Sequence, residues 1–216
     1  MSEMIFINKV ILDELIEDYP ALAFCRADIE KAYFILEECY KNGGKLLACG
    51  NGGSASDSTH IVGELMKGFK LKRLLSDEAK KAFSELPGGE YIASGLQGAL
   101  PAISLTTENA LMTAFLNDCD PDLVFAQQVY GLMKKGDVLI ALSTSGNSKN
   151  VVHAAVTAKA LCGKTVAITG ERESKLSELC DCTIKLPSRD TAKIQEYTLP
   201  VYHALCAMLE AAFFDC

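Results

Sequence analysis

The sequence has no tryptophan, only three histidines and no apolar run near the length of about 20 residues that a membrane-spanning helix requires. Residues 1–6 lack a basic stretch followed by an apolar block, so we expect no signal peptide. Acidic residues outnumber basic ones, and the net charge is −7. An acidic chain of this kind argues against nucleic acids and membranes as partners.

Cysteine is frequent, but none of the nine cysteines forms a Cys-x-x-Cys pair with another. The odd number and the scattered positions favour free thiols and a reducing, cytoplasmic location. Cys180 and Cys182 are the closest pair and are one candidate for a metal or redox site. The simpler interpretation is that two thiols lie at the start of a strand.

The length of 216 residues, 49% of them hydrophobic, fits one domain with a sizeable core. Apolar strands alternate with amphipathic helices over most of the chain. This alternation predicts an α/β fold in which helices cover both faces of a parallel sheet. Two amphipathic helices, at 3–18 and 26–41, precede the sheet. Residues 70–100 do not fit the alternation, and we expect an insertion or flap there that contains a short charged helix at 76–86.

The remaining elements are expected at the following positions. Strands are expected at 45–49, 101–105, 137–142, 165–169 and 183–186. Helices are expected at 55–69, with Ser54 as its cap, and at 108–117, 122–134, 148–161, 174–179 and 191–213.

Two loops of small and hydroxyl-bearing residues follow two of these strands. Residues 50–54 read Gly-Asn-Gly-Gly-Ser, and residues 143–148 read Ser-Thr-Ser-Gly-Asn-Ser. Small residues let the backbone approach a ligand, hydroxyls donate hydrogen bonds, and the helix after each loop directs free N–H groups at an anion. Since ligands of parallel sheets bind beyond the carboxyl ends of strands, the two loops predict a small phosphorylated ligand.

The first loop also matches the loose dinucleotide fingerprint G-x-G-x-x-[G/A]. That interpretation needs a second strand that ends in an acidic residue about 20 positions further on. Residues 70–73 occupy this region, and they read Lys-Leu-Lys-Arg with no convincing strand. We therefore disfavour a nicotinamide-dependent enzyme.

Candidate acid–base or metal-binding residues occur on two of the predicted helices. His60 and Glu64 share one helix face, which suits two metal ligands, an acid–base pair or a plain surface interaction. Gln195 and His203 are about 80° apart around the last helix, so both can face one cavity. The alternative for His203 is a buried histidine satisfied by a neighbour. Pro200, between them, is expected to bend the helix or to free a carbonyl.

The two loops and the segment 193–196, Lys-Ile-Gln-Glu, together resemble the motifs of the SIS (sugar isomerase) domain family, in the same order. The resemblance covers nearly the whole chain and is strongest to the phosphoheptose isomerase branch. It implies one SIS domain over residues 1–216, a flavodoxin-like three-layer sandwich, and a homotetramer with sites at subunit interfaces. The implied reaction converts sedoheptulose 7-phosphate to D-glycero-D-manno-heptose 7-phosphate through an enediol.

The same resemblance assigns roles to individual residues. Glu64 and His203 match the catalytic acid–base pair of the family. The zinc ligands found in some members match His60, Glu64, Gln195 and His203, so we expect one zinc ion per subunit. Residues that match the family's sugar-phosphate site are Asn51, Gly52, Gly53, Ser54, Asp118, Ser143, Thr144, Ser145, Ser148 and Gln195.

The chain departs from the family pattern at three places. Gly68 stands where relatives commonly have a basic residue, and Lys67 or Lys70 is a candidate replacement. Ala192 stands where many relatives have aspartate, and Asp190 precedes it by two residues. The third departure is the long insertion at 70–100. All three are expected near the sugar, so they bear on which sugar binds more than on the phosphate.

Two other functions are known among SIS proteins. Some members bind other proteins without catalysis, including one that binds a bacterial replication initiator, and others sense sugar phosphates. The presence of both Glu64 and His203 favours the enzyme. The absence of an attached DNA-binding segment makes the sensor the weaker alternative.

Overall fold

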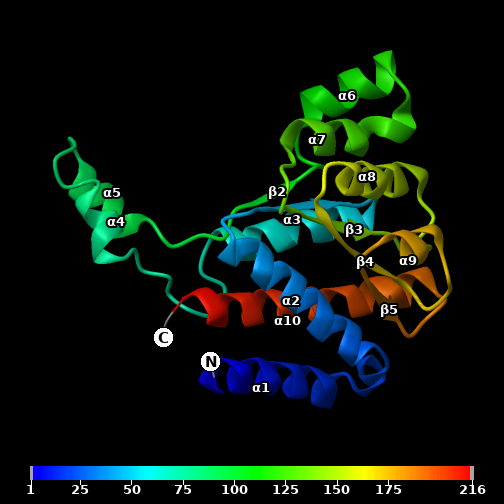
Figure 1. Cartoon of the computed structure of the whole chain (residues 1–216), viewed down its shortest axis with the longest axis horizontal. Coiled ribbons are helices and arrows are strands. Elements are labelled where there is room, and N and C mark those ends of the chain that lie inside the picture. Colours follow the sequence, from blue (N-terminus) through cyan, green and yellow to red (C-terminus); the bar gives the residue numbers. More distant parts are fainter. Residues whose placement is uncertain (1, 215–216) are drawn as a thin grey trace.

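The computed structural model describes residues 2–214, so residues 1, 215 and 216 of the predicted domain lie outside the described part. Within it, five parallel strands form one sheet in the order β2-β1-β3-β4-β5 (Figure 1). They are β1 (Leu46–Cys49), β2 (Ala102–Ser104), β3 (Val138–Leu142), β4 (Lys164–Gly170) and β5 (Cys182–Leu186). The chain runs from β1 to β2 and then returns to β3 on the other side of β1. The predicted parallel sheet is confirmed.

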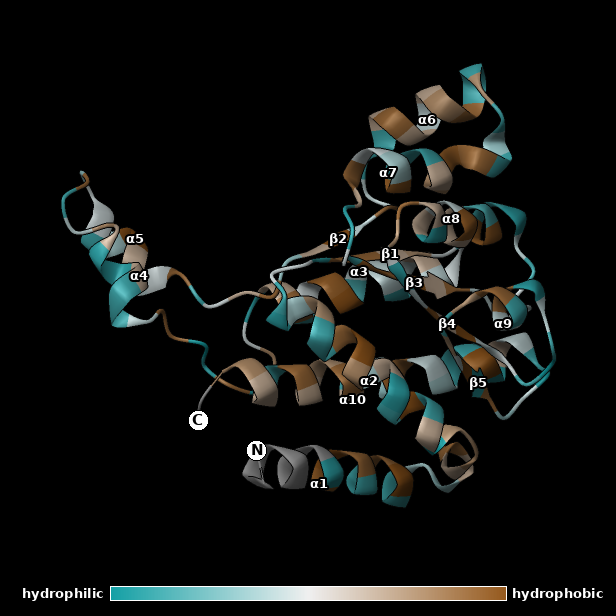
Figure 2. Cartoon of the chain, in the orientation of Figure 1, coloured by the Kyte–Doolittle hydropathy of each residue, from teal (hydrophilic) through white to brown (hydrophobic). Residues whose placement is uncertain are grey.

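The strands are buried on both faces because alternate residues point to opposite sides of the sheet. On β1, Leu46 and Ala48 belong to one hydrophobic core, and Leu47 and Cys49 belong to the other. Figure 2 shows the hydrophobic strands enclosed between helices. The fold is therefore a three-layer α/β sandwich, as expected.

Different helices cover the two faces of the sheet. The first core lies under α2 (Arg26–Lys41), α3 (Gly53–Met66) and α10 (Thr191–Phe213). The N-terminal helix α1 (Ser2–Asp18) packs against α10, and the 3-10 helix η1 (Pro20–Cys25) leads from α1 into α2. The second core lies under α7 (Val124–Leu132), α8 (Lys149–Ala160) and α9 (Lys175–Leu179). Helix α6 (Asn109–Asp118) and the short η2 (Pro121–Leu123) precede α7, and α6 has no buried residue.

The beginning of α3 differs from the prediction. The helix begins at Gly53 and not at residue 55, and Gly52 is its N-cap residue. The prediction that Ser54 caps this helix is therefore wrong, since Ser54 lies in its first turn. Gly52 has a φ of +57°, which a residue with a side chain rarely adopts, so the tight turn after β1 depends on glycine. Pro200 lies inside α10, which continues to Phe213.

Residues 76–96 form an arm that projects away from the sandwich (Figure 1). It contains α4 (Asp77–Lys81), shorter than the helix expected at 76–86, and α5 (Gly89–Gly95), which the sequence did not predict. An antiparallel bridge between Leu74 and Gln97 joins the two chain segments at its root. No helix in residues 2–214 is both long enough and apolar enough to cross a membrane.

Candidate active site

The two loops of small and hydroxyl-bearing residues lie next to each other, where the winding of the sheet reverses. They follow β1 and β3, which are neighbours in the sheet. The side-chain amides of Asn51 and Asn150 exchange two hydrogen bonds of 2.9 Å and so join the first loop to the beginning of α8. A ligand of a parallel sheet is expected at this reversal point, beyond the carboxyl ends of the strands.

The second loop brings two hydroxyl groups together where it begins and ends. The hydroxyl oxygens of Ser143 and Ser148 lie 3.0 Å apart, and Ser148 is the N-cap residue of α8 without a side-chain capping hydrogen bond. Thr144 is half-buried and Ser145 is exposed. Hydroxyl donors at the N-terminus of a helix are the chemistry that a phosphate group requires.

Gln195 connects the first loop to α10. A Cβ atom on Gly53 would lie 2.7 Å from Nε2 of Gln195, so a larger residue at position 53 would require the end of this side chain to move. Eight residues of α10, about 12 Å along the helix axis, separate Gln195 from His203. Gln195 thus lies beside the loop of the predicted phosphate site.

The predicted acid–base residues form a cluster between α3 and α10. Nε2 of His60 lies 3.0 Å from Oε1 of Glu64, and the rings of His60 and His203 pack edge to face at 5.0 Å between centroids. The Glu64 side chain is 13% exposed, so its carboxylate is shielded from most of the solvent without being sealed off. The structure therefore brings together three of the four residues that were expected to act at the reacting end.

The surroundings of His203 favour its uncharged form. Burial first, and then the neighbouring His60, lower the pKa of His203 below its usual value. Its Nε2 atom is buried and has no hydrogen-bond partner in the described part of the chain. The ring of Phe69 packs against it with 5.2 Å between centroids. A buried polar atom without a partner is uncommon and marks a position where a ligand would complete the hydrogen bonding.

A buried ion pair supports the end of α3 that carries Glu64. The carboxylate of Glu210 accepts hydrogen bonds of 2.7, 2.7 and 3.1 Å from the backbone N–H groups of residues 69–71, and one of 2.8 Å from Nε of Arg73. The Arg73 guanidinium also donates to the backbone carbonyls of Glu64 and Leu65, at 2.8 and 2.6 Å. Because these carbonyls end α3, the pair fixes the last turn of that helix to α10.

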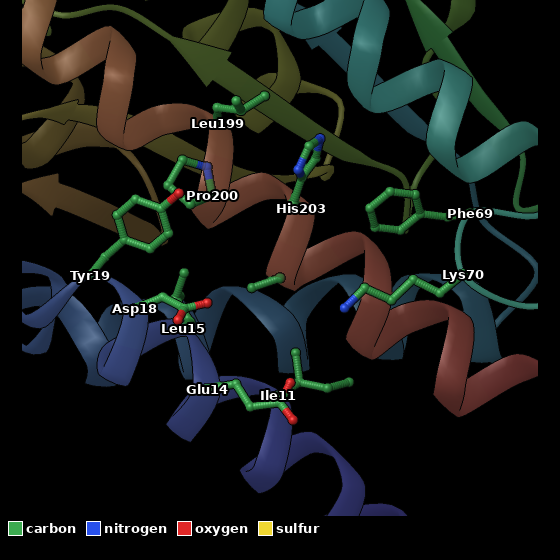
Figure 3. A pocket seen from close by; sticks show the side chains of 11 residues that line it. Ile11, Glu14, Leu15, Asp18, Tyr19, Phe69, Lys70, Leu199, Pro200 and His203 are labelled. Atoms are coloured by element: carbon green, nitrogen blue, oxygen red, sulfur yellow. The ribbon is translucent and has the colours of Figure 1, made fainter.

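The basic residues around Gly68 occupy two different places. Nζ of Lys67 lies 3.5 Å from Oε2 of Glu64. Lys70 points toward α1 into a pocket of about 210 Å³ between α1 and α10, which His203 also lines (Figure 3). At Gly68 itself, a Cβ atom would lie 2.4 Å from the carbonyl oxygen of Leu71, so this turn excludes a side chain.

Two other residues singled out in the sequence lie elsewhere. Asp118 ends α6, on the opposite side of the molecule from α10, and accepts a hydrogen bond from the neighbouring Asn117 (Figure 1). Asp190 caps α10 by accepting a hydrogen bond of 2.9 Å from the backbone of Lys193. The single chain therefore does not bring Asp118 to the cluster, and Asp190 has a structural role.

Comparison with known proteins agrees with this arrangement. Family models described as SIS domain match residues 92–214 and 22–86. The chain is 40% identical over 182 residues to the phosphoheptose isomerase of Aliarcobacter butzleri, covering 84% of both sequences. It is 35% identical over 214 residues to the phosphoheptose isomerase of Akkermansia muciniphila, covering 99% of both. The chain belongs to the phosphoheptose isomerase family of SIS-domain proteins.

Solved structures of phosphoheptose isomerases share the fold. The structure of phosphoheptose isomerase GmhA from Neisseria gonorrhoeae matches with a TM-score of 0.72 at 29% identity, covering 97% of this chain and 98% of that one. A phosphoheptose isomerase from Francisella tularensis matches with the same TM-score at 28% identity and the same coverage. The resemblance to the SIS family and the assignment as an isomerase are thus confirmed.

Sequence reasoning missed three residues that support the cluster of this family member. Arg73 and Glu210 form the buried ion pair, and the hydroxyl of Tyr202 contacts His60 at 2.8 Å. Glu210 carries a detectable signal, because it is the single charged residue of the apolar segment 204–214 and such a residue needs a buried partner. Tyr202 carries no such signal in the sequence, because a tyrosine on an apolar helix face is common and does not by itself indicate a contact with a histidine.

Proposed function

We propose that the chain interconverts sedoheptulose 7-phosphate and D-glycero-D-manno-heptose 7-phosphate. The observation that carries this proposal is the pairing of two kinds of site along α3 and α10. The two loops suited to a phosphate lie at the beginnings of α3 and α8. The carboxylate and imidazole suited to proton transfer lie in the last turns of α3 and further along α10. A sugar phosphate extended from one site to the other would place its carbonyl end beside Glu64.

The reaction moves a proton between C1 and C2 of the sugar. In the ketose-to-aldose direction, Glu64 as the base takes a proton from C1, and the C–H electrons form the C1–C2 double bond of an enediol. Negative charge then develops on the oxygen at C2, where a donated hydrogen bond or proton stabilises it. Loss of the hydroxyl proton at C1 then forms the carbonyl of the aldose, while the C1–C2 double-bond electrons take a proton back at C2 from Glu64.

His203 is the proposed group at the carbonyl oxygen. Its lowered pKa keeps the imidazole neutral near pH 7, so it acts as a hydrogen-bond donor and not as a fixed positive charge. Contact with substrate would also satisfy the buried Nε2 atom that lacks a partner among residues 2–214. Phe69, packed on the imidazole ring, helps to hold it in place.

The base assignment is tested with Glu64→Gln. The amide keeps the shape of the side chain but cannot take a proton, so turnover should fall by at least about 10²-fold while phosphate-dependent binding persists. Conversion of sedoheptulose 7-phosphate is followed by NMR, and binding by the substrate-induced rise in Tm. Glu178→Gln, at an exposed position on α9, is the matched control. Full activity of Glu64→Gln would overturn the assignment.

Zinc binding by His60, Glu64, Gln195 and His203 stays a prediction. The donor types suit zinc, but within residues 2–214 no group of three or more histidine, cysteine or acidic side chains is arranged to hold a metal ion. The hydrogen bond between His60 and Glu64 uses atoms that zinc would need. No reaction step is therefore assigned to a bound ion. Metal analysis of protein purified without chelators tests the prediction, and a metal content near zero after zinc addition would contradict it.

A homotetramer with sites at subunit interfaces is the proposed assembly. Helix α6 has no buried residue and exposes Leu111 and Leu116, which an interface would cover. Asp118 lies away from its own chain's cluster, so it reaches a substrate only in a neighbouring subunit's site. Light scattering tests the assembly. Mixing inactive Asp118→Ala with inactive Glu64→Gln should restore activity if sites are shared, and no recovery would indicate that they are not.

A reducing compartment such as the cytoplasm is the proposed location. All eight cysteines in the described part of the chain are unpaired, and burial raises the pKa of Cys180 and of Cys182 to about 11. Both thiols are thus protonated and unreactive at neutral pH. Unmodified thiols in the protein isolated from its cells would support this location, and a disulfide would contradict it.

A further inference from the structure

The two loops of the predicted phosphate site contain hydroxyl groups but no positive charge. Neither residues 50–54 nor residues 143–148 include a lysine or an arginine. Lys149, which follows the second loop directly, pairs with Asp122, with 3.3 Å between Nζ and Oδ2. A phosphate group carries a charge of about −1.5 to −2 at pH 7. A cation from outside the two loops would supply the counter-charge that the loops lack.

A pocket of about 290 Å³ lies beside the second loop. Its lining includes Thr144 and Ser145 of that loop and residues of the two loops that follow β4 and β5. It therefore lies at the carboxyl ends of β3, β4 and β5, which are neighbours in the sheet. Two arginines line it, Arg172 after β4 and Arg189 after β5. The pocket thus brings positively charged groups next to the hydroxyl groups of the second loop.

The two arginines differ in their partners. Arg189 forms an ion pair with Glu171, and the other carboxylate of the pocket, that of Glu173, forms one with Lys185. The side chain of Arg172 is exposed and has no hydrogen bond, ion pair or ring contact with any of residues 2–214. The carboxylates that line the pocket are therefore neutralised by other residues, and the guanidinium of Arg172 remains available to an anion.

Backbone hydrogen bonds hold the loop that carries Arg172 against the second loop. The N–H group of Gly170 donates to the carbonyl oxygen of Thr144 at 3.0 Å, and the N–H group of Leu176 donates to that of Gly146 at 3.1 Å. The segment between these two points is thus fixed to the second loop at both of its ends. Arg172 lies two residues after the first point, so its backbone has a fixed place beside the second loop.

From this arrangement we propose that Arg172 binds the phosphate group of the substrate together with the hydroxyl groups of the second loop, and so selects phosphorylated sugars. A guanidinium group is planar and can donate two parallel hydrogen bonds to phosphate oxygens. Because the phosphate is remote from C1 and C2, Arg172 contributes to binding and not to proton transfer. The proposal rests on the proposed function, which makes a sugar phosphate the substrate.

Kinetics of Arg172→Gln test the proposal. The variant should fold normally, because the side chain forms no hydrogen bond or ion pair within residues 2–214. KM for sedoheptulose 7-phosphate should rise by about tenfold or more, since hydrogen bonds between charged groups are lost. The value of kcat should stay nearly the same, because the phosphate is bound equally in the ground state and the transition state. Inorganic phosphate, as a competitive inhibitor, should show a similar rise in its inhibition constant.

Two further variants make the test specific. Arg172→Lys keeps the charge but not the planar group, so it should retain part of the affinity. Lys175→Gln removes one positive charge three residues further along the chain, at an exposed position outside the lining of the pocket. It is the matched control and should leave KM and the inhibition constant of phosphate unchanged.

The outcomes separate this proposal from the proposed function. Unchanged KM and inhibition constant in Arg172→Gln would overturn the role of Arg172, and so would an equally large effect of Lys175→Gln, which would reflect only the charge of the whole chain. A rise in KM without a rise in the inhibition constant of phosphate would also contradict it, since Arg172 would then contact the sugar. Absence of conversion by the unmodified chain would instead refute the proposed function, while the rise in Tm with inorganic phosphate would still test Arg172.

Discussion

Replacing Glu210 by glutamine removes the charge of a carboxylate that accepts four hydrogen bonds inside the protein. Three come from the backbone of residues 69–71, and the fourth comes from Arg73. The two side chains are 0% and 1% exposed, so solvent cannot replace the lost interactions. The Arg73 guanidinium would remain buried without its counter-charge.

The size of the effect follows from this burial. Removing one partner of a buried ion pair typically costs about 3–5 kcal/mol. Glutamine keeps one carbonyl oxygen that accepts hydrogen bonds, so we expect the lower end, about 3 kcal/mol. For a chain of 216 residues, each kcal/mol lowers Tm by about 2–4 °C, and the expected fall is about 6–12 °C.

The pH dependence gives a second test of the same carboxylate. Burial opposes its ionisation, but the N–H donors of Phe69 and Lys70 and the charge of Arg73 outweigh burial and hold the pKa of Glu210 below its usual value. A lowered pKa stabilises the fold above the unfolded pKa of about 4.3, and this stabilisation is lost as pH falls through the folded value. The Tm difference between the original chain and Glu210→Gln should therefore be full at pH 7 and shrink below about pH 4.

Thermal unfolding followed by circular dichroism measures both effects. Glu90→Gln, on the exposed surface of the arm, is the control and should leave Tm nearly unchanged. A fall in Tm of less than about 2 °C for Glu210→Gln at pH 7 would refute the assigned strength of the pair. A Tm difference that does not change between pH 7 and pH 3 would refute the role of the ionised carboxylate.

Three further substitutions test the site. Ser148→Ala removes a hydroxyl from the second loop, and we expect KM to rise by about tenfold or more at similar kcat. The reason is that hydrogen bonds to charged groups contribute about 1.5–3 kcal/mol. An unchanged KM would show that Ser148 does not bind the phosphate. Gly53→Ala should displace Gln195 and lower kcat/KM with little change in Tm, as measured by kinetics and melting. Gly68→Arg should lower Tm by several degrees, because the new Cβ atom would clash with the carbonyl oxygen of Leu71. An unchanged Tm would show that the backbone of this turn shifts to accept a side chain.

Most of the fold was predictable from the order of apolar strands and periodic helices. The strands at 46–49 and 138–142 are continuous apolar runs, which is typical of central parallel strands. Helix α5 was not predicted because glycine at both of its ends is typical of loops. The start of α3 was misplaced because serine is a common cap, whereas the backbone at Gly52 makes the turn without one.

The site was predictable only where spacing along one helix or a family motif indicated it. His60 and Glu64 are neighbours because residues four apart share a helix face. The contact between Arg73 and Glu210 joins residues 137 positions apart, and no local pattern encodes such a pair. The placement of Gln195 beside Gly53 likewise depends on how α10 packs against α3.

The proton transfer itself is the central claim, and one NMR experiment in D₂O tests it most directly. Sedoheptulose 7-phosphate incubated with the unmodified chain should yield an aldose phosphate that carries deuterium at C2, because the proton taken by Glu64 exchanges with solvent before it is returned. Glu64→Gln should yield no product. Absence of conversion by the unmodified chain, or an aldose that retains all of the original C1 hydrogen at C2, would contradict isomerisation through an enediol.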